Sequence, residues 1–101
     1  MRATDAAIEK YLETKTAKGS SFEQVLAEIE AQNWPLDRVS HEHGVTRIIR
    51  GVGYEVVGTS SIRAELGSYG LIFNTYVSAS WAFNQAGELI FVKVTRSTDA
   101  I

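Results

Sequence analysis

The sequence predicts an α+β domain, with two N-terminal helices packed on one face of a four-stranded antiparallel meander sheet in the order α-α-β-β-β-β. Two patterns predict this class. Apolar residues recur at helical spacing in the first third of the chain, and they alternate with polar residues through most of the second half. The chain of 101 residues has the usual size of one domain, so we expect a single α+β domain over residues 1–101.

Two helices are expected before the single proline of the chain. The first covers residues 4–18 and ends at Gly19, a residue type that commonly follows a helix. The second begins at Ser20, which stands three residues before Glu23 in the arrangement of a capping box. Pro35 disfavours helical geometry in the preceding residue and so ends the second helix. The apolar stripes are Ala7, Ile8, Tyr11 and Leu12 in the first helix, and Phe22, Val25, Leu26 and Ile29 in the second.

Four strands are expected in the second half of the chain, because alternating stretches there are separated by glycine-containing turns. The first three cover 45–50, 54–66 and 71–83, and the last follows a loop at 84–87 and includes Ile90, Val92 and Val94. The third strand has the longest alternation, and one face of it consists of Leu71, Phe73, Thr75, Val77, Ala79, Trp81 and Phe83. Residues 36–44 fit either a short strand or a loop.

Two short connections would fix the pairing of the last three strands. If residues 67–70 and 84–87 both form loops, apolar side chains meet on one face of both hairpins, and a slip of one residue would break this match. The expected pairs are Ala64 with Phe73, Ile62 with Thr75, Val56 with Trp81, Trp81 with Ile90, Ala79 with Val92 and Val77 with Val94. Trp81 is therefore expected between two apolar neighbours, beneath the helices.

The same pairing leaves several apolar side chains on the opposite face of the sheet. It places Val57, Ser80 and Phe91 in one row, with Leu89 beside Ala82 and Tyr76 beside Thr95. A flat patch of small and aromatic residues is typical of a protein-binding or self-association surface. The alternative is that these residues are scattered over the surface or covered by the C-terminal tail. The candidate interaction surface consists of Val57, Tyr76, Ser80, Leu89 and Phe91.

Composition excludes several classes of function. The chain has no cysteine, which excludes disulfides, thiolate metal sites and cysteine nucleophiles. Its net charge of -2 does not favour binding to nucleic acid or to an acidic membrane surface. No apolar run reaches the roughly 18 residues of a membrane-spanning helix. Residues 1–5 also lack the apolar segment of a secretory signal.

Two histidines form the best metal-binding pattern of the chain. His41 and His43 would point to one side of an extended segment, with a spacing that can hold zinc, copper or nickel. No third ligand can be identified, so a solvated loop is the favoured interpretation. The segment Gly51 to Gly53 leads into a strand rather than a helix, unlike a phosphate-binding loop. No arrangement of nucleophile and base points to an enzyme, and we expect no catalytic residues and no cofactor.

Two stretches of the second half carry a resemblance: residues 60–69, SSIRAELGSY, and residues 81–90, WAFNQAGELI, which runs on to Asp99 and Ala100. They resemble small, uncharacterised bacterial proteins of the cell envelope, often lipoproteins. The order of two helices and a meander, with SSFEQVL at 20–26 opening the second helix, also resembles the outer-membrane-assembly lipoprotein and β-lactamase-inhibitor-protein architecture. The resemblance implies a domain that binds other proteins without catalysis. It implies the periplasm or cell envelope if an export signal was removed, and otherwise the cytoplasm.

The sequence therefore predicts a non-catalytic protein-interaction module that binds a partner protein, or a second copy of itself as a homodimer, through the outer sheet face. The alternative is a small-ligand or enzyme-like pocket between the second helix and a curved sheet, as in cystatin-like folds. Trp34, Tyr54 and Trp81 would form its walls. Such a pocket needs a cavity of roughly a few hundred Å³ with convergent polar groups.

Overall fold

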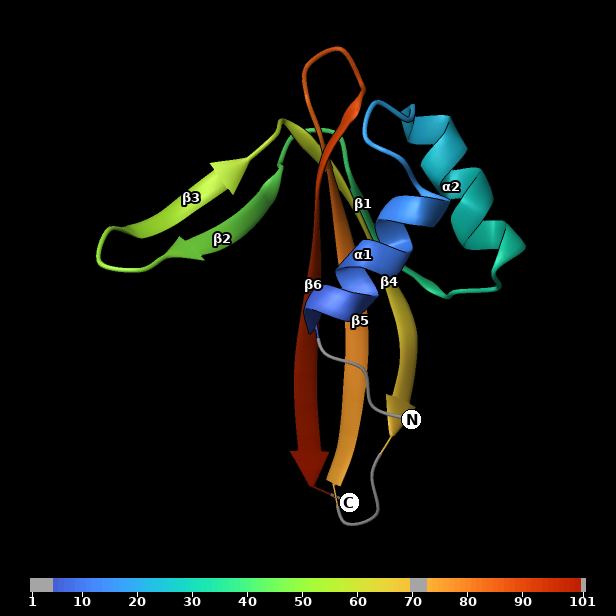
Figure 1. Ribbon diagram of the computed structural model, residues 1–101, viewed down its shortest axis with the longest axis vertical. Helices are drawn as coiled ribbons and strands as arrows, with labels where there is room; N and C mark the ends of the chain where they lie inside the picture. Colours follow the sequence, from blue (N-terminus) through green and yellow to red (C-terminus); the bar gives the residue numbers. More distant parts are fainter. Residues whose placement is uncertain (1–4, 70–72, 101) are drawn as a thin grey trace.

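The computed structural model describes residues 5–69 and 73–100, with the backbone alone at residues 5, 48, 68–69, 73–75 and 97–100. In these ranges two helices precede six strands (Figure 1). The helices are α1 (Asp5–Lys15) and α2 (Phe22–Ala31). The strands are β1 (Leu36–Ser40), β2 (Val45–Ile49), β3 (Gly53–Val57), β4 (Ser60–Tyr69), β5 (Phe73–Phe83) and β6 (Leu89–Ala100). Neither described helix has the length and apolar character needed to cross a membrane.

The strands form two separate antiparallel sheets. β1, β4, β5 and β6 make a four-stranded sheet in the order β1-β4-β5-β6, and β2 and β3 make a two-stranded hairpin. The α+β class with a four-stranded antiparallel sheet is therefore confirmed, but the predicted meander of four consecutive strands is wrong. Residues 45–49 and 53–57 lie in the hairpin. Residues 36–40, which fitted either a strand or a loop, form the edge strand beside β4.

Two glycines explain why the alternation at 54–66 is divided between two sheets. Gly58 has a φ of +80°, and a Cβ there would lie 2.5 Å from the Phe83 carbonyl oxygen. A Cβ at Gly44 would overlap the Val57 carbonyl oxygen. The backbone therefore turns at Gly58 and passes close to other segments, as glycine permits. The sequence pattern does not show this turn, because the alternation continues through it.

β4 and β5 pair in a different register from the predicted one. Ile62 lies opposite Trp81, and Ala64 lies opposite Ala79. A shift in the register between residues 65 and 67 carries β4 on to Tyr69, so the strand runs into the segment that was predicted as a loop. The predicted pairs that are wrong here are Val56 with Trp81, Ile62 with Thr75, and Ala64 with Phe73.

β5 and β6 also pair out of the predicted register, but with the predicted face toward the core. Trp81 lies opposite Val92, where Ile90 was predicted. Ala79 lies opposite Val94, where Val92 was predicted. The partner of Trp81 is thus two residues along β6 from the predicted one. Because side chains alternate along a strand, such a shift keeps each apolar side chain on the same face.

A β-bulge at the start of β6 changes which residues of this strand are buried. Phe83 pairs with Leu89, and Ile90 is the extra residue of the bulge and is 37% exposed. The Leu89 N–H donates to the Ser20 carbonyl and the Gly19 N–H donates to the Leu89 carbonyl, both at 2.9 Å. These bonds hold Leu89 beside the link between the helices, where it is 1% exposed. Its prediction as an interaction-surface residue is therefore wrong.

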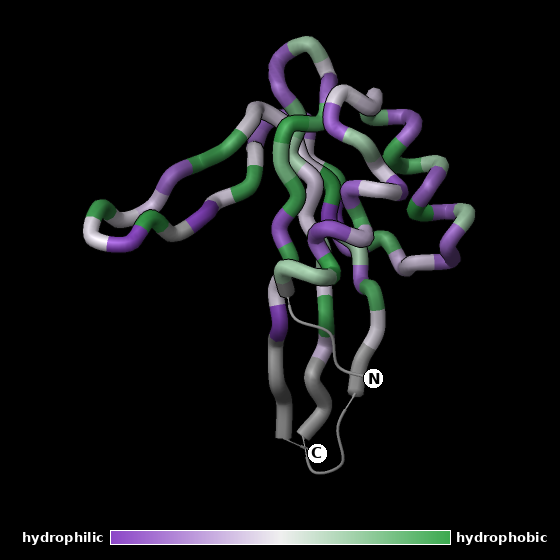
Figure 2. The backbone as a smooth tube through the Cα atoms, viewed as in Figure 1, coloured by the Kyte–Doolittle hydropathy of each residue, from purple (hydrophilic) through white to green (hydrophobic). Residues whose placement is uncertain are grey.

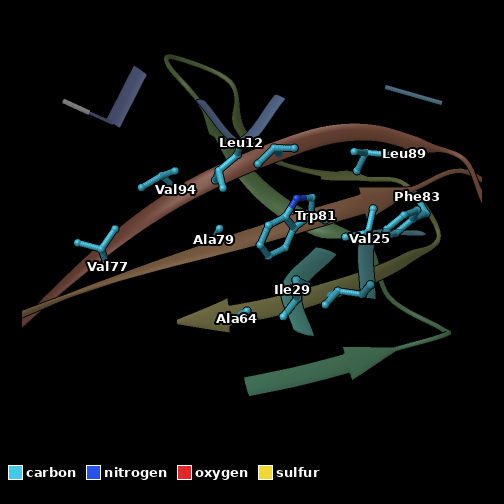
Figure 3. Close-up of a cluster of buried hydrophobic side chains, with 12 residues drawn as sticks. Leu12, Val25, Ile29, Ala64, Val77, Ala79, Trp81, Phe83, Leu89 and Val94 are labelled. Carbon is cyan, nitrogen blue, oxygen red and sulfur yellow. The ribbon is translucent and has the colours of Figure 1, made fainter. Parts of the chain in front are cut away.

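The core lies where side chains of α1 and α2 meet one face of the four-stranded sheet (Figure 3). Trp81 is fully buried, and its indole Nε1 donates to Thr16 Oγ1 at 3.0 Å. The Thr16 hydroxyl in turn donates to the Leu12 carbonyl at 2.7 Å, so these buried polar groups have partners. The buried residues of this core cluster are Leu12, Val25, Ile29, Ile62, Ala64, Val77, Ala79, Trp81, Phe83, Leu89, Val92 and Val94. We call the opposite side of the four-stranded sheet the outer face.

The capping box of α2 stands one residue beyond the predicted one. Ser21 is the N-cap residue, and its Oγ accepts from the Gln24 N–H at 3.1 Å. The Gln24 Oε1 accepts from the Ser21 N–H at 2.8 Å and completes the box. The prediction placed the capping box at Ser20 and Glu23. Ser21 and Gln24, each one residue further along the chain, fit the same sequence rule.

Candidate interaction surface

The β2–β3 hairpin, residues 45–57, extends away from the four-stranded sheet (Figure 1), and we call it the hairpin arm. Its strands are paired in full, from Val45 opposite Val57 to Ile49 opposite Gly53. Figure 2 shows hydrophobic residues along the arm as well as in the body of the molecule. The arm is therefore a regular hairpin that carries apolar residues outside the core.

Three of these apolar side chains are mostly exposed. Val52 is 79% exposed, Tyr54 is 77% exposed and Val56 is 62% exposed, the highest values among the exposed large hydrophobic residues of the described chain. Tyr54 and Val56 are two residues apart in β3 and so share one face of the hairpin. Val52 lies in the turn before β3, where its N–H donates to the Ile49 carbonyl at 3.0 Å. We call Val52, Tyr54 and Val56 the apolar strip.

The base of the hairpin arm is anchored to the four-stranded sheet. Val45 is 7% exposed and belongs to the start of β2. The Lys93 Nζ of β6 donates to the Thr46 carbonyl at 2.9 Å. The Arg47 guanidinium lies 5.5 Å from the centre of the Phe91 ring, also in β6. These contacts hold the base, so the apolar strip is presented in a defined direction.

A row of three basic residues and one serine crosses the outer face beside the base of the arm. From β1 to β6, the residues opposite one another are Arg38, Arg63, Ser80 and Lys93. We call these four residues the cationic row. They line a cavity of about 220 Å³, together with Gly44, Val45, Thr46, Ser61, Ile62 and Thr95. The described lining includes three cations and no carboxylate.

The structure separates three residues that were predicted to form one row. Val57 lies in β3 and pairs with Val45, so it is not beside Ser80 or Phe91. Ser80 belongs to the cationic row, between Arg63 and Lys93. Phe91 of β6 lies opposite Ala82 of β5. Its ring contacts the Arg47 guanidinium of the arm. The predicted row is wrong because β3 pairs outside the four-stranded sheet.

The other two predicted surface residues also lie apart from each other. Tyr76 is half-buried and lines a cavity of about 370 Å³ with Trp34, Pro35 and Leu66, among others. Leu89 belongs to the core on the opposite side of the sheet. The five residues of the predicted interaction surface therefore do not form a single patch.

The two histidines do not form an extended pair, the arrangement that a metal site would need and that was the less favoured interpretation. They lie in the bend after β1, where Ser40 Oγ accepts from the backbone N–H of Glu42 at 3.3 Å and from that of His43 at 3.1 Å. The His41 ring packs against the Phe22 ring, with their centroids 5.0 Å apart. Among the described residues, no group of three or more histidine, cysteine, aspartate or glutamate residues could hold a metal ion.

Of the three aromatic residues of the alternative pocket, Tyr54 lies apart from the other two. Trp34 and Trp81 stack with their ring centroids 6.3 Å apart, and Trp81 is 0% exposed. Tyr54 lies on the hairpin arm. Trp81 does not line the cavity at the cationic row, the cavity at Tyr76 or the one at His41. These aromatic side chains therefore fill the core or extend into solvent.

Sequence reasoning missed the apolar strip and most of the cationic row. Tyr54 and Val56 were assigned to a strand of the main sheet, Val52 to the glycine-rich link before it, and Arg38 lay in a segment without an assignment. The available signal was the spacing of glycines, since Gly44 and Gly58 enclose an alternating stretch with a glycine-rich turn at its centre. That pattern is typical of an independent hairpin.

Comparison with known proteins adds no family. No protein-family model, no curated protein and no solved structure matches the chain. The resemblance to envelope lipoproteins therefore stays a prediction.

Proposed function

We propose that the protein is a non-catalytic interaction module that binds a partner protein through the hairpin arm. The observation that supports this proposal is the exposure of the apolar strip, 79% at Val52, 77% at Tyr54 and 62% at Val56. Single exposed apolar residues are common on protein surfaces. Three of them close together on an extended hairpin are typical of an interaction site.

Burial of the apolar strip would supply a useful part of a binding free energy. Removing apolar surface from water is worth about 25 cal/mol per Å², or about 1.5–3 kcal/mol for one large apolar side chain. Tyrosine is enriched among the residues that dominate interface energies. Tyr54 stands between the two valines of the strip, so we expect it to contribute most.

The strand edges of the arm offer a second kind of contact. In the described chain, β2 and β3 pair only with each other. Each therefore has one edge of backbone N–H and C=O groups that a partner strand can pair with. A two-stranded hairpin is only marginally stable in water, and a third strand would stabilise it.

The charges of the arm favour a protein partner over nucleic acid. The Arg47 guanidinium lies 3.2 Å from the Glu55 carboxylate, which offsets its charge. The chain as a whole carries a net charge of -2. Nucleic-acid binding depends on many unpaired basic residues, and the apolar strip itself carries no charge.

The first experiment asks where a partner lies. A photo-crosslinking amino acid is placed at position 54, and in a matched control at position 11. Tyr11 of α1 is also a partly exposed tyrosine, 48% exposed, but it lies on a helix away from the arm. Purified protein alone tests a second copy as the partner. Cells that express the variant test another protein, which is then identified and purified.

The second experiment measures affinity for that partner. Tyr54→Asp combined with Val56→Asp should weaken binding by at least about a hundredfold, as expected for two interface residues of about 1.4 kcal/mol or more each. Tyr11→Asp should change it by less than about threefold. Unchanged binding in the double variant, with circular dichroism showing an intact fold, would contradict the proposal.

A further inference from the structure

We propose that the cavity at the cationic row binds a phosphate group, as the free ion or as a monoester. This inference goes beyond protein binding by the hairpin arm, and it depends on different residues. Arg38, Arg63 and Lys93 come from three strands of one sheet and line a single cavity.

The charges around the cavity fit a doubly charged anion. The Asp37 carboxylate lies 3.1 Å from Arg63 Nε and offsets one of the three positive charges. Two positive charges remain, on Arg38 and Lys93. A phosphate monoester carries about -1.5 to -2 charges at pH 7, whereas a carboxylate carries about -1. Phosphate therefore matches the site more closely than a carboxylate does.

The pairing of the strands places like charges directly opposite each other. Arg38 of β1 faces Arg63 of β4, an arrangement that destabilises a sheet when nothing offsets it. Asp37 is paired with Arg63 at its Nε. An anion between the two guanidinium groups would turn this repulsion into two favourable contacts.

The row also has hydrogen-bond donors that the protein does not satisfy. Arg63 Nε is buried and lies 3.1 Å from the Asp37 carboxylate without hydrogen-bond geometry, so it belongs to this ion pair and is not a donor for the anion. Arg63 Nη2 reaches Ser78 Oγ only at 3.5 Å. Lys93 donates to the Thr46 carbonyl, and an ammonium group has further donors. The Ser80 hydroxyl also lines the cavity.

The size of the cavity fits a small group. Its volume of about 220 Å³ exceeds the roughly 30 Å³ of a single water molecule and falls below the roughly 300 Å³ at which pockets for drug-sized ligands begin. A phosphate with a few waters fits this range. A larger ligand would place only its phosphate inside the cavity.

The experiment is a titration followed by the backbone amide signals of Arg63, Ser80 and Lys93 in NMR spectra of the full chain. The probes are inorganic phosphate and phenyl phosphate, with acetate and chloride at the same ionic strength because salt screens exposed charges. Phosphate should shift these signals at a concentration at least about tenfold lower than acetate or chloride does. Tighter binding of phenyl phosphate than of inorganic phosphate assigns an esterified phosphate, and the reverse assigns the free ion.

Two matched variants test whether the cationic row is responsible. Arg38→Met removes one charge from the cavity, and Arg50→Met removes one from an exposed residue after β2 that does not line it. The affinity of the Arg38→Met variant for phosphate should be at least about tenfold lower than that of the unmodified protein. The affinity of the Arg50→Met variant should differ by less than about twofold. Lys93→Met, as a second cavity variant, should behave like Arg38→Met.

Three outcomes would overturn the proposal: phosphate binding no tighter than chloride binding, acetate binding as tightly as phosphate, or equal losses in the Arg38 and Arg50 variants. The combined Tyr54 and Val56 variant should bind phosphate within about twofold of the unmodified protein. A failure of this proposal can therefore be separated from a failure of partner binding by the arm.

Discussion

The core face of the four-stranded sheet and the hairpin arm have the same kind of alternating sequence but opposite surroundings. Trp81 of β5 is 0% exposed, whereas Tyr54 of β3 is 77% exposed. Side chains of α1 and α2 cover the first, and no described element covers the second. Alternation therefore identifies residues that share a face, and burial depends on whether another layer can reach that face.

The strongest test of this comparison replaces one aromatic residue in each region. Trp81→Ala should lower the free energy of unfolding by about 3–5 kcal/mol, because it opens a cavity and leaves Thr16 without its indole partner. Tyr54→Ala should change it by less than about 0.5 kcal/mol, since exposed side chains contribute little. Urea unfolding followed by circular dichroism measures both. Similar losses would mean that the arm is packed against the body in solution.

A smaller effect is expected where the arm joins the sheet. Gly58 and Gly51 have nearly equal φ values, +80° and +79°, so alanine meets the same backbone strain at both. An added Cβ at Gly58 would lie 2.5 Å from the Phe83 carbonyl oxygen, whereas at Gly51 no atom lies within 4 Å. Gly58→Ala should therefore destabilise the protein by about 1–3 kcal/mol more than Gly51→Ala. Equal losses in thermal or urea unfolding would show that the close approach at Gly58 has no energetic cost.

These comparisons show which parts of the fold could be predicted. The sides of β5 and β6 that face the core followed from alternation, because the actual pairing of Trp81 with Val92 preserves the predicted side. The register could not be predicted in the same way. The bulge at Ile90 and the continuation of β4 to Tyr69 change the pairing but leave the alternation in the rest of these strands intact. Both features depend on long-range contacts, such as the bonds between Leu89 and the link between the helices.

The candidate sites depended even more on tertiary pairing. Ser80 was expected on the outer face, but its neighbours Arg63 and Lys93 follow only from the true register. Arg38 belongs to the row because β1 pairs with β4, although the whole hairpin arm lies between these two strands in the sequence. The sequence marks the arm only by its glycines, whose role becomes visible when the segments they approach are known.

The smallest predicted effect concerns the helix that covers the core face. Ser21→Ala should lower the free energy of unfolding by about 1 kcal/mol because it removes the side-chain acceptor of the Gln24 N–H. Ser20→Ala should cost only a few tenths of a kcal/mol, roughly, because the Ser20 carbonyl that bonds Leu89 is retained. Amide hydrogen exchange sharpens the contrast between the two regions. The cap variant should speed exchange in α2 and leave the rates in β2 and β3 unchanged, since the arm extends away from the body of the molecule and its apolar strip is largely exposed. A larger loss at Ser20 would restore the capping box that the sequence alone suggested.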